Sequence, residues 1–333
     1  MFAWQLSECP GDYTFGQVDD PVPGPGEVRI EVRASALNHM DLWLTRGRPR
    51  PPAFPHVPGS DVAGVIESLG DGVTGWSVGD EVVVNSALVP VDALERGVDS
   101  VLDPAMRILG EHCWGGHGRL CVVGAHQLEA KPVGRSWAEV AAYPVCATTA
   151  WRLLRRARLE PGDTVLVTGV SGGVATAALT MAVHLGARVF VTSRDPAKRE
   201  RALALGAEGA FDSEGPYPIA ADIVVDSIGP ATWDAAFRSL RPGGRMCVCG
   251  GTSGPTTTLD LPRLFFKQLD IIGASIGSQE EFRSVTEMVA LGLPVVIDEV
   301  LPLERYPEAL RRLRGSEQLG KLVLEHPVGD DPA

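Results

Sequence analysis

The sequence is poor in positive charge, in cysteine and in long apolar runs, and each shortage excludes a class of protein. Its 30 Lys and Arg residues stand against 42 Asp and Glu, which gives a formal net charge of −12. Such a chain has no long-range attraction to a phosphate backbone or to an anionic membrane surface. We therefore expect neither nucleic acid nor a membrane among its partners.

The start of the chain lacks the positively charged segment of a secretory signal, because its first basic residue is Arg29. We therefore expect a cytoplasmic protein. Its six cysteines have irregular spacing, which in a chain without an export signal favours free thiols over a set of disulfides. The 333 residues leave room for about two domains, so a small domain held together by disulfides is excluded.

One uncharged run, residues 164–187, is long enough to span a bilayer. It contains the pair Gly172 and Gly173, several Thr and Ser residues, and His184. We therefore interpret the run as a strand, a turn and a helix.

The first third of the chain is rich in short strands and turns. A Gly/Pro-rich turn at residues 21–26 precedes an alternating strand at residues 27–33. Further short apolar runs at residues 61–68 and 80–85 are separated by glycine-containing turns. This pattern predicts a compact antiparallel β-barrel.

From about Glu129 the pattern changes to alternating helices and strands. Strands that alternate with helices predict βαβ units and a doubly wound parallel sheet, so the fold class is α/β. The expected helices lie at residues 137–155, 174–185, 196–205 and 231–240, and the expected strands at residues 164–168, 188–192, 223–226 and 245–249. The tail predicts helices at residues 278–290 and 306–314, an extended stretch at 295–300 and a last strand at 321–324.

A glycine-rich turn follows the first of these strands and opens a helix, as a dinucleotide-binding turn does. Gly172, Gly173 and Val174 lie where the backbone would approach a pyrophosphate, which the free N–H groups of the helix N-terminus would bind. Val170 and Ala175 replace the first and third glycines of the usual fingerprint. A plain strand–helix turn is the alternative.

The end of the second strand indicates which nucleotide is bound. An NAD enzyme has an acidic residue there, whereas a 2′-phosphate needs hydroxyl and cationic donors. Ser193 stands at the acidic position, with Arg194 beside it and Lys198 one turn further on. This favours NADPH, and the alternative is that Arg194 and Lys198 belong to a solvated helix face.

The chain resembles the medium-chain dehydrogenase/reductase superfamily, and more narrowly its zinc-free quinone-oxidoreductase and enoyl-reductase branch. The resemblance runs from about Pro21 to Leu324 and rests on several motifs in combination. They are the glycine-rich turn at residues 169–175 and Pro23-Gly-Pro-Gly-Glu-Val28, Ala36-Leu-Asn-His-Met-Asp-Leu42, Pro58-Gly-Ser-Asp-Val-Ala-Gly-Val65, Val78-Gly-Asp-Glu-Val82, Pro144-Val-Cys-Ala-Thr-Thr-Ala-Trp151, Leu240-Arg-Pro-Gly-Gly-Arg245 and Gly320-Lys-Leu-Val323.

The resemblance implies a GroES-like β-barrel substrate domain at residues 1–127 and 277–333, and a Rossmann NADP-binding domain at residues 128–276. It also implies a small-molecule substrate and a homodimer formed by edge-to-edge pairing of Rossmann sheets, near residues 245–249 and 269–275.

Both zinc sites of the family look lost. The positions of the catalytic zinc ligands correspond to Asn38, Ser60 and Val145, none of which is a good ligand for Zn²⁺. The lobe that carries four cysteines in many relatives corresponds to residues 89–102, which contain none. We therefore expect no metal.

A second group of possible metal ligands is His112, Cys113, His117 and Cys121, which fall within ten residues. If the segment after Gly116 is a strand, His117 and Cys121 share a face. A turn and a strand at the domain junction is the favoured interpretation, and metal binding is the alternative.

The loss of zinc decides the expected chemistry, because alcohol oxidation needs help in removing the hydroxyl proton whereas hydride delivery to an activated C=C bond does not. By its match to the family, Asn38 is the candidate donor to an enolate; bonding to the adjoining backbone or to the cofactor ribose is equally open. Trp43 aligns with an aromatic residue that lines the nicotinamide pocket, although a bare aromatic is more often core.

The resemblance assigns further cofactor contacts to Thr149, Gly250, Gly251, Thr252 and Lys321. No general acid is evident, so the α-carbon proton comes from water or from a group such as Cys146 or Asp61.

Three functions follow from these expectations. The first is NADPH-dependent, zinc-independent reduction of an activated C=C bond in a quinone, an enone or an enoyl thioester. The second is a carbonyl reductase or alcohol dehydrogenase that lacks zinc. The third is an NADPH-binding protein without turnover.

Overall fold

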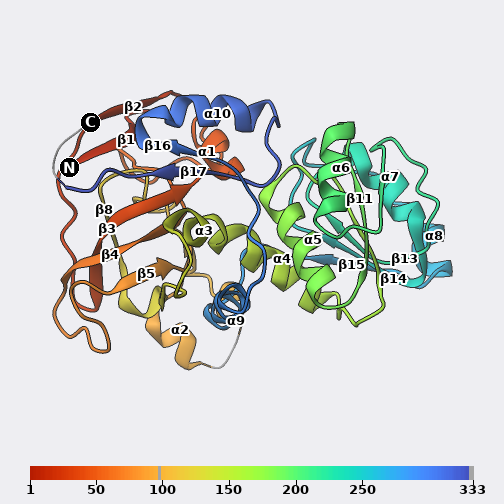
Figure 1. The fold of residues 1–333 in the computed structure, drawn as a ribbon, viewed down its shortest axis with the longest axis horizontal. Helices are drawn as coiled ribbons and strands as arrows, with labels where there is room; N and C mark the ends of the chain where they lie inside the picture. Colours follow the sequence, from red (N-terminus) through yellow and green to blue (C-terminus); the bar gives the residue numbers. More distant parts are fainter. Residues whose placement is uncertain (97–98, 330–333) are drawn as a thin grey trace. The chain divides into compact units, whose positions relative to one another are not determined.

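The computed structural model describes residues 1–96 and 99–329, and its internal contacts divide the chain into two compact units (Figure 1). Unit 1 comprises Met1–Val145, Gly277–Leu291 and Ile297–Ala333, and unit 2 comprises Cys146–Ile276 and Gly292–Val296. Residues 330–333, the end of the segment expected at 277–333, lie outside the described residues, as do residues 97 and 98.

Unit 1 is built on a seven-stranded sheet in the order β16-β17-β3-β4-β5-β9, with β8 also paired to β3. All of its pairings are antiparallel except that of β16 with β17. The strands are β3 (Glu27–Ala36), β4 (Asp61–Leu69), β5 (Glu81–Val84), β8 (Leu120–Gly124), β9 (Leu128–Ala130), β16 (Ile297–Pro302) and β17 (Lys321–Glu325). Strand β3 is longer than expected because Ala34, Ser35 and Ala36 pair with β17, which comes from the other end of the chain.

Smaller elements surround this sheet. The two-stranded sheets are β1 (Phe2–Leu6) with β2 (Tyr13–Gln17) and β6 (Ala87–Leu88) with β7 (Arg107–Ile108). The helices are α1 (His39–Leu44), α2 (Val91–Glu95), α3 (Trp137–Ala142), α9 (Gln279–Ala290) and α10 (Tyr306–Arg314), with short 3-10 turns η1 (Ser100–Leu102), η2 (Ala125–Gln127) and η3 (Leu303–Arg305).

The boundary between the units lies at Val145, later than the 127/128 boundary expected from the sequence. Helix α3 contacts β3, β4 and β17, and it buries Val140 and Ala141. This apolar face holds residues 128–145 in unit 1. The helix expected at residues 137–155 is interrupted at Tyr143, and α4 (Pro144–Arg156) starts at Pro144, which has no N–H to continue the preceding helix.

Unit 2 is a six-stranded, fully parallel sheet in the order β12-β11-β10-β13-β14-β15. The strands are β10 (Thr164–Val167), β11 (Arg188–Thr192), β12 (Gly209–Phe211), β13 (Ala221–Asp226), β14 (Leu240–Val248) and β15 (Asp270–Gly273). Helices α5 (Gly173–His184), α6 (Pro196–Ala204), α7 (Pro230–Ser239) and α8 (Leu261–Phe266) alternate with them. The strand order reverses between β10 and β13, and such a switch point is where open α/β sheets bind their ligands.

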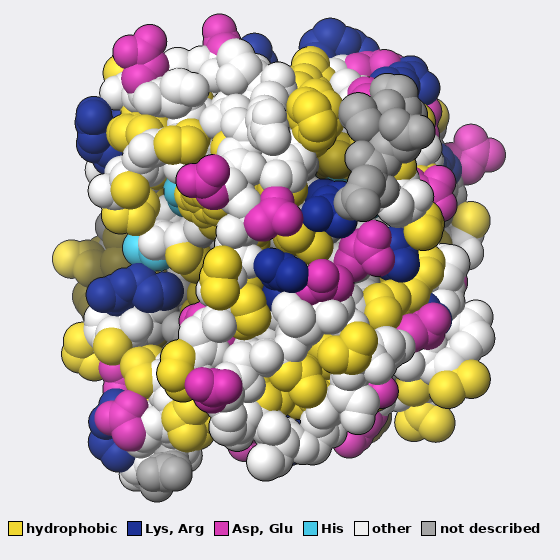
Figure 2. Space-filling model, turned by 90° about the vertical axis from the view of Figure 1, so that its left-hand side faces the viewer, with side chains coloured by type: hydrophobic (Ala, Val, Ile, Leu, Met, Phe, Trp, Pro, Cys, Tyr) yellow, Lys and Arg dark blue, Asp and Glu magenta, His cyan; other side chains and the backbone are white. Residues whose placement is uncertain are grey.

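The uncharged run at residues 164–187 is β10, a turn and α5, so the interpretation as strand, turn and helix is confirmed. Among the described residues no helix combines the length and apolar character required to cross a bilayer. On the face drawn in Figure 2, acidic and basic side chains are interspersed and no broad basic area is visible.

Candidate active site

The ends of three strands bring Asn38, Asp61 and Lys321 together in unit 1. Asn38 follows β3, whereas Asp61 and Lys321 are the first residues of β4 and β17. Ala36, close to the end of β3, pairs with both Asp61 and Val323. The sheet register therefore places three polar residues from distant parts of the chain at one point.

Short hydrogen bonds connect these three side chains. The Lys321 Nζ donates to Asn38 Oδ1 over 2.7 Å, to Asp61 Oδ2 over 2.8 Å and to the Leu37 carbonyl over 2.6 Å. The Asn38 Nδ2 donates to the same Asp61 oxygen over 2.9 Å. The other Asp61 oxygen accepts a bond of 2.8 Å from the Val145 N–H. Each member of the cluster is thus fixed by at least two of its neighbours.

The cluster is buried and holds one charge of each sign. Lys321 is 4% exposed and Asp61 is 0% exposed. A buried ammonium without a counter-ion would be strongly unfavourable, and here the Asp61 carboxylate compensates it. The cluster therefore carries no net charge, and it places a positive group beside the oxygen of the Asn38 carboxamide.

This donor set does not fit zinc. Asn38, Ser60 and Val145, at the positions that correspond to the family's catalytic ligands, offer an amide, a hydroxyl and an alkyl side chain, whereas Zn²⁺ binds Cys, His and carboxylate. The Lys321 ammonium beside Asn38 would also repel a divalent cation. Within the described part of the chain no group of three or more His, Cys, Asp or Glu residues could hold a metal ion.

Helix α1, which begins after Asn38, is held by Asp41. The Asp41 carboxylate accepts a bond of 2.7 Å from the backbone N–H of Asn38. Tyr13 donates to the Asp41 carbonyl over 2.9 Å, and the Tyr306 hydroxyl lies 3.4 Å from the carboxylate. Burial, and then the charge of Asp41, raise the pKa of Tyr306 well above its usual range, so Tyr306 stays protonated. These contacts fix the backbone that carries Asn38.

A row of buried polar groups continues behind Asp41. The Nε2 of His117 lies 3.4 Å from Asp41 Oδ1. The Nδ1 of His117 and the Nε2 of His326 each lie 2.8 Å from the Ser35 hydroxyl. Ser35, His117 and His326 therefore form a hydrogen-bonded row that ends beside the carboxylate holding Asn38, and His117 Nε2 makes no hydrogen bond within the described residues.

Trp43 lies on α1 with 39% of its surface exposed, and its ring centroid is 6.3 Å from that of His39. Burial, and next the charge of Lys321, lower the pKa of His39, so this imidazole is neutral at pH 7. The Trp43 indole, five residues after Asn38, therefore does not fill the core, and its contact with the nicotinamide stays a prediction.

The four candidate ligands at residues 112–121 do not converge. Cys113 and Cys121 pack in the apolar core of the sheet with Val28 and Ile30. His117 faces Ser35, and the Nδ1 of His112 accepts a bond from the Ile108 N–H. His117 and Cys121 do not share a strand face, because β8 begins only at Leu120.

In unit 2 the glycine-rich turn lies at the carboxyl end of β10. Gly169 has a φ of +63°, and a Cβ there would come within 2.5 Å of Ile228. A Cβ on Gly172 would meet no atom within 4 Å, so open space lies above the turn where α5 begins. Bare backbone, open space and a helix N-terminus are what a pyrophosphate needs, so the turn fits a dinucleotide.

The residues expected at the nucleotide 2′-position gather beside this turn. Ser193 is buried at the end of β11, where its hydroxyl accepts a bond of 3.2 Å from the Asp195 N–H. Lys198 is buried on α6, and its ammonium donates to Ser171 Oγ over 3.2 Å. Arg194 is exposed. A hydroxyl and a buried cation at this place suit a 2′-phosphate better than they suit a ribose 2′-hydroxyl.

The remaining expected cofactor residues are in unit 2 as well. Thr149 is buried on α4. Thr252 donates to the Ser227 carbonyl from its N–H over 3.5 Å and from its hydroxyl over 3.4 Å. A Cβ on Gly250 would come within 2.9 Å of that carbonyl, so the turn requires a glycine there. Lys321, in contrast, belongs to unit 1 and is bonded to Asn38.

Sequence reasoning missed several residues around both sites. Asp226, at the end of β13, is fully buried and accepts bonds from the Thr232 hydroxyl over 2.8 Å and the Gly229 N–H over 2.8 Å. Its position at a strand end beside the switch point is a signal that could have identified it. Asp41 could have been found as the acidic residue three positions after a helix N-cap. Nothing in the sequence pattern pointed to Ser35 or His326.

Two family models match the chain. Residues 24–133 match the alcohol dehydrogenase GroES-like domain, and residues 173–290 match the zinc-binding dehydrogenase domain. A GroES-like domain followed by a Rossmann-like parallel sheet defines a nicotinamide-dependent class of oxidoreductases, and the α/β fold expected from the sequence is confirmed.

Curated relatives cover most of the chain. It is 32% identical over 321 residues to a zinc-type alcohol dehydrogenase-like protein of Schizosaccharomyces pombe, covering 90% of this chain and 91% of the relative. It is 31% identical over 326 residues to the acryloyl-coenzyme A reductase of Metallosphaera sedula, covering 94% and 96%.

Solved structures of similar proteins superpose on almost the whole chain. An NAD-dependent alcohol dehydrogenase superposes with a TM-score of 0.91 at 34% identity, over 99% of this chain and 100% of that one. The 2-octenoyl-CoA carboxylase reductase CinF, in complex with NADP and 2-octenoyl-CoA, superposes with a TM-score of 0.91 at 27% identity, over 99% and 88%. The chain belongs to the medium-chain dehydrogenase/reductase superfamily.

Proposed function

We propose that this protein is an NADPH-dependent, zinc-independent reductase of activated C=C bonds, acting on a quinone, an enone or an enoyl thioester. The observation that carries this proposal is the 2.7 Å hydrogen bond from the Lys321 ammonium to the Asn38 carboxamide, in place of a metal ligand set. The acryloyl-coenzyme A reductase and the CoA-bound CinF complex among the similar proteins support the same chemistry.

The chemistry requires a group that stabilises negative charge on the acceptor oxygen. NADPH, when bound, supplies a hydride to the β-carbon, and the electron pair displaced from the C=C bond forms an enolate. Because Lys321 donates to Asn38 Oδ1, it polarises the carboxamide and makes its N–H groups stronger donors. In a buried site, donors already fixed in place act without reorganisation during the reaction.

The Asp61 carboxylate has a separate role in this scheme. It holds the Lys321 ammonium and Asn38 Nδ2 through the same oxygen, over 2.8 and 2.9 Å. Asp61 therefore keeps the carboxamide plane fixed and holds the Lys321 ammonium beside it. The α-carbon proton is left to water in this scheme, because every polar atom of the Asp61 carboxylate already accepts a bond.

We further propose NADPH as the preferred cofactor, on the grounds of Ser193 and of the buried Lys198 beside the glycine-rich turn. In this scheme Ser193, Arg194 and Lys198 hold the 2′-phosphate, and Gly172, Gly173 and Val174 hold the pyrophosphate. Thr149, Gly250, Gly251 and Thr252 line the nicotinamide end.

We propose a homodimer formed through β15. This strand is the edge of the unit 2 sheet, and apolar side chains stand exposed on and beside it, among them Phe265, Phe266 and Ile271. An exposed strand edge with an apolar surface is a ready template for pairing with a second copy.

The test is to mix the protein with NADPH and a quinone, an enone and an enoyl-CoA thioester, to follow NADPH absorbance, and to identify products by mass spectrometry. Saturation of the C=C bond is expected for the enone or the thioester, and conversion to the hydroquinone is expected for the quinone. The similarity to an NAD-dependent alcohol dehydrogenase makes carbonyl reduction the second candidate, and an alcohol product with the alkene retained would select it. Tight NADPH binding without consumption would instead indicate a non-catalytic protein.

A further inference from the structure

The carboxylate of Asp226 lies where the strand order of the unit 2 sheet reverses. Asp226 is the last residue of β13, the neighbour of β10, and it is fully buried. The three groups that donate hydrogen bonds to this carboxylate are all neutral. A carboxylate buried among neutral groups is unfavourable unless its oxygens accept hydrogen bonds. Its donors therefore show which parts of the fold depend on Asp226.

Each of these donors belongs to a segment at the carboxyl edge of the sheet. The Thr168 hydroxyl, directly after β10, donates to Asp226 Oδ1. The Gly229 N–H donates to Oδ2 over 2.8 Å, and the Thr232 hydroxyl, in the first turn of α7, donates to Oδ1 over 2.8 Å. The backbone carbonyl of Asp226 accepts a bond of 3.1 Å from the Cys249 N–H, directly after β14. Asp226 therefore joins the segments that leave β10, β13 and β14.

The segment after β13 contacts the other two segments. A Cβ on Gly169 would come within 2.5 Å of Ile228, so the glycine-rich turn lies against that side chain. The Ile228 carbonyl accepts bonds from the N–H of Ser253 over 2.9 Å and from its hydroxyl over 2.6 Å. A Cβ on Gly229 would lie 3.1 Å from the Cα of Gly251. A shift of this segment would therefore displace both the glycine-rich turn and the turn that follows β14.

We propose that Asp226 is a positioning residue for the pyrophosphate and nicotinamide parts of the cofactor. The inference rests on the proposed function, in which these parts lie against the glycine-rich turn and the turn that follows β14. Both oxygens of Asp226 already accept bonds from the protein, so Asp226 acts through Thr168 and Gly229 rather than by touching the cofactor. The 2′-phosphate is assigned instead to residues that follow β11, on the opposite side of β10 from β13.

The test measures nucleotide binding to the full chain by isothermal titration calorimetry. The two ligands are NADPH and adenosine 2′-monophosphate, which contains only the 2′-phosphate end of the cofactor. Asp226→Ala removes the hydrogen bonds of the carboxylate, so the affinity for NADPH is expected to fall about 30-fold. The affinity for adenosine 2′-monophosphate is expected to stay within about twofold of the wild-type value, whereas a general loss of folding would lower the binding stoichiometry of both ligands.

Asp222→Ala is the matched control. Asp222 lies near the other end of β13, and its carboxylate also joins β13 to β10, because it accepts a bond of 2.8 Å from the Thr164 N–H. The control therefore removes the same kind of contact between the same two strands, but away from the turns. We expect it to leave both affinities unchanged.

Asp226→Asn tests rescue by a side chain of the same shape. The asparagine oxygen can accept from the Gly229 N–H while the amide donates to the Thr168 and Thr232 hydroxyls. These hydroxyls then donate to the carbonyls of Val225 and Gly229, which lie 3.4 and 3.3 Å away. The affinity for NADPH should therefore stay within about threefold of the wild-type value. A loss as large as that in Asp226→Ala would overturn the positioning role, because hydrogen bonding alone would then be insufficient.

Thr168→Val covers failure of the Asp226 variants to fold. It keeps the carboxylate and removes only the bond to the segment after β10, so the affinity for NADPH is expected to fall about fivefold while that for adenosine 2′-monophosphate is unchanged. Unchanged NADPH affinity in Asp226→Ala, or equal losses for both ligands, would overturn the inference and leave the proposed cofactor in place. Absence of NADPH binding in the wild-type protein would overturn the proposed function and the inference with it.

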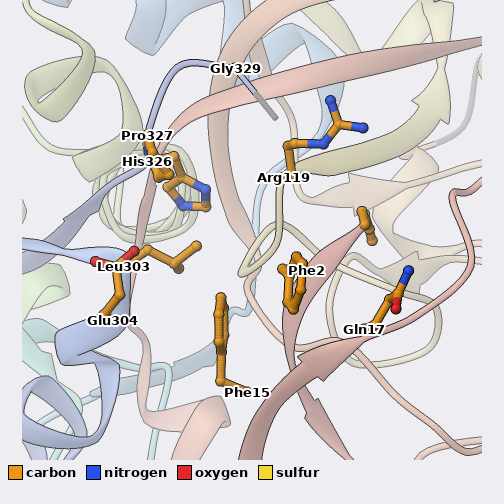
Figure 3. Close-up of a pocket in the computed structure, with 10 residues that line it drawn as sticks. Phe2, Phe15, Gln17, Arg119, Leu303, Glu304, His326, Pro327 and Gly329 are labelled. Carbon is orange, nitrogen blue, oxygen red and sulfur yellow. The ribbon is translucent and has the colours of Figure 1, made fainter. Parts of the chain in front are cut away.

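The pocket of unit 1 does not offer a second nucleotide site. It has a volume of about 180 Å³, and Phe2 and Phe15 lie side by side in its wall (Figure 3). The Arg119 guanidinium at this pocket lies 3.4 Å from the Asp20 carboxylate, and Glu304 adds a negative charge. A phosphate binds where cations and N–H groups are not already compensated by carboxylates. We therefore expect the NADPH binding measured by calorimetry to occur in unit 2.

Discussion

Lys321 donates a hydrogen bond of 2.7 Å to the side-chain oxygen of Asn38, although 283 positions separate the two residues in the chain. From the sequence alone, Asn38 is expected at the substrate and Lys321 at the cofactor. In the proposed mechanism this contact makes Lys321 a positioning residue for Asn38, and the ammonium supplies the positive group that a metal ion supplies in zinc enzymes.

The first prediction concerns this pair. Lys321→Met leaves the buried Asp61 carboxylate without its cation, so we expect the free energy of unfolding to fall by about 3–5 kcal/mol. We expect kcat to fall about 100-fold, because the carboxamide loses its polarising partner. Urea titration and steady-state kinetics measure the two effects.

The double variant Lys321→Met/Asp61→Asn separates stability from activity. It removes both charges, so stability should return towards the wild-type value while kcat stays low. If the double variant regained both the wild-type stability and the wild-type kcat, the Lys321 ammonium would have no role in the reaction.

The second prediction concerns the nucleotide. Ser193→Asp places a carboxylate where the 2′-phosphate is expected, so kcat/KM with NADPH should fall about 100-fold while kcat/KM with NADH rises. Lys198→Ala should weaken the binding of NADPH about tenfold and leave the binding of NADH unchanged, since only the 2′-phosphate needs the cation.

Arg238→Ala, which changes an exposed arginine of α7, serves as the control for charge removal in unit 2. Equal preference for the two nucleotides in the wild-type protein would contradict the NADPH assignment.

The third prediction concerns metal. Because Asn38, Ser60 and Val145 do not form a zinc site, prolonged dialysis against a chelator should leave the rate of NADPH consumption unchanged within about twofold. Elemental analysis of the same samples gives the zinc content. Loss of activity that added Zn²⁺ restores would contradict the proposed mechanism.

The fourth prediction concerns pH and stability. Burial, and next the neighbouring His117, lower the pKa of His326 to about 3, whereas an unfolded histidine titrates near 6.5. Between these two pH values His326 is therefore protonated in the unfolded chain but not in the folded protein. This contribution to stability is complete above pH 6.5 and is lost as the pH falls from 6.5 towards 3.

Thermal unfolding at a series of pH values between 7 and 5 measures the effect. The loss of Tm on acidification should be shallower in His326→Leu than in the wild-type protein. Parallel curves would show that His326 is accessible to protons in the folded state.

The fifth prediction concerns assembly. Light scattering coupled to gel filtration should show a dimer for the wild-type protein and a monomer for the double variant Phe266→Glu/Ile271→Lys, which places charges on the exposed surface beside β15. Phe266 is 79% exposed in the isolated chain. Leu203→Lys, on the exposed surface of α6, should remain a dimer, and a monomeric wild-type protein would contradict the proposal.

Local patterns were sufficient for most of the elements. Strand β11 and helix α10 begin and end at the expected residues, because alternation and a 3.6-residue period are properties of contiguous sequence. The departures have tertiary causes. Strand β3 extends to Ala36 because β17 pairs with it, and the expected helix at residues 137–155 divides at a proline.

Only part of the candidate site could be predicted from the sequence. The glycine-rich turn and Ser193 follow strands directly, so their motifs placed them. The bond of Lys198 to Ser171 joins two separate strand–helix turns, and the sequence could not show that these turns meet.

The sequence by itself determined the two kinds of domain and the glycine-rich turn, because these depend on patterns of residues close together in the chain. It also determined that Asn38, Ser60 and Val145 stand at the positions of the family's zinc ligands, because a local motif marks each position. Only the tertiary structure decided that Lys321 and Asp61 hold Asn38, and that Ser35 links His117 to His326. Those contacts form where strands from the two ends of the chain pair in one sheet, and burial in that sheet excludes the water that would otherwise compete for these polar groups.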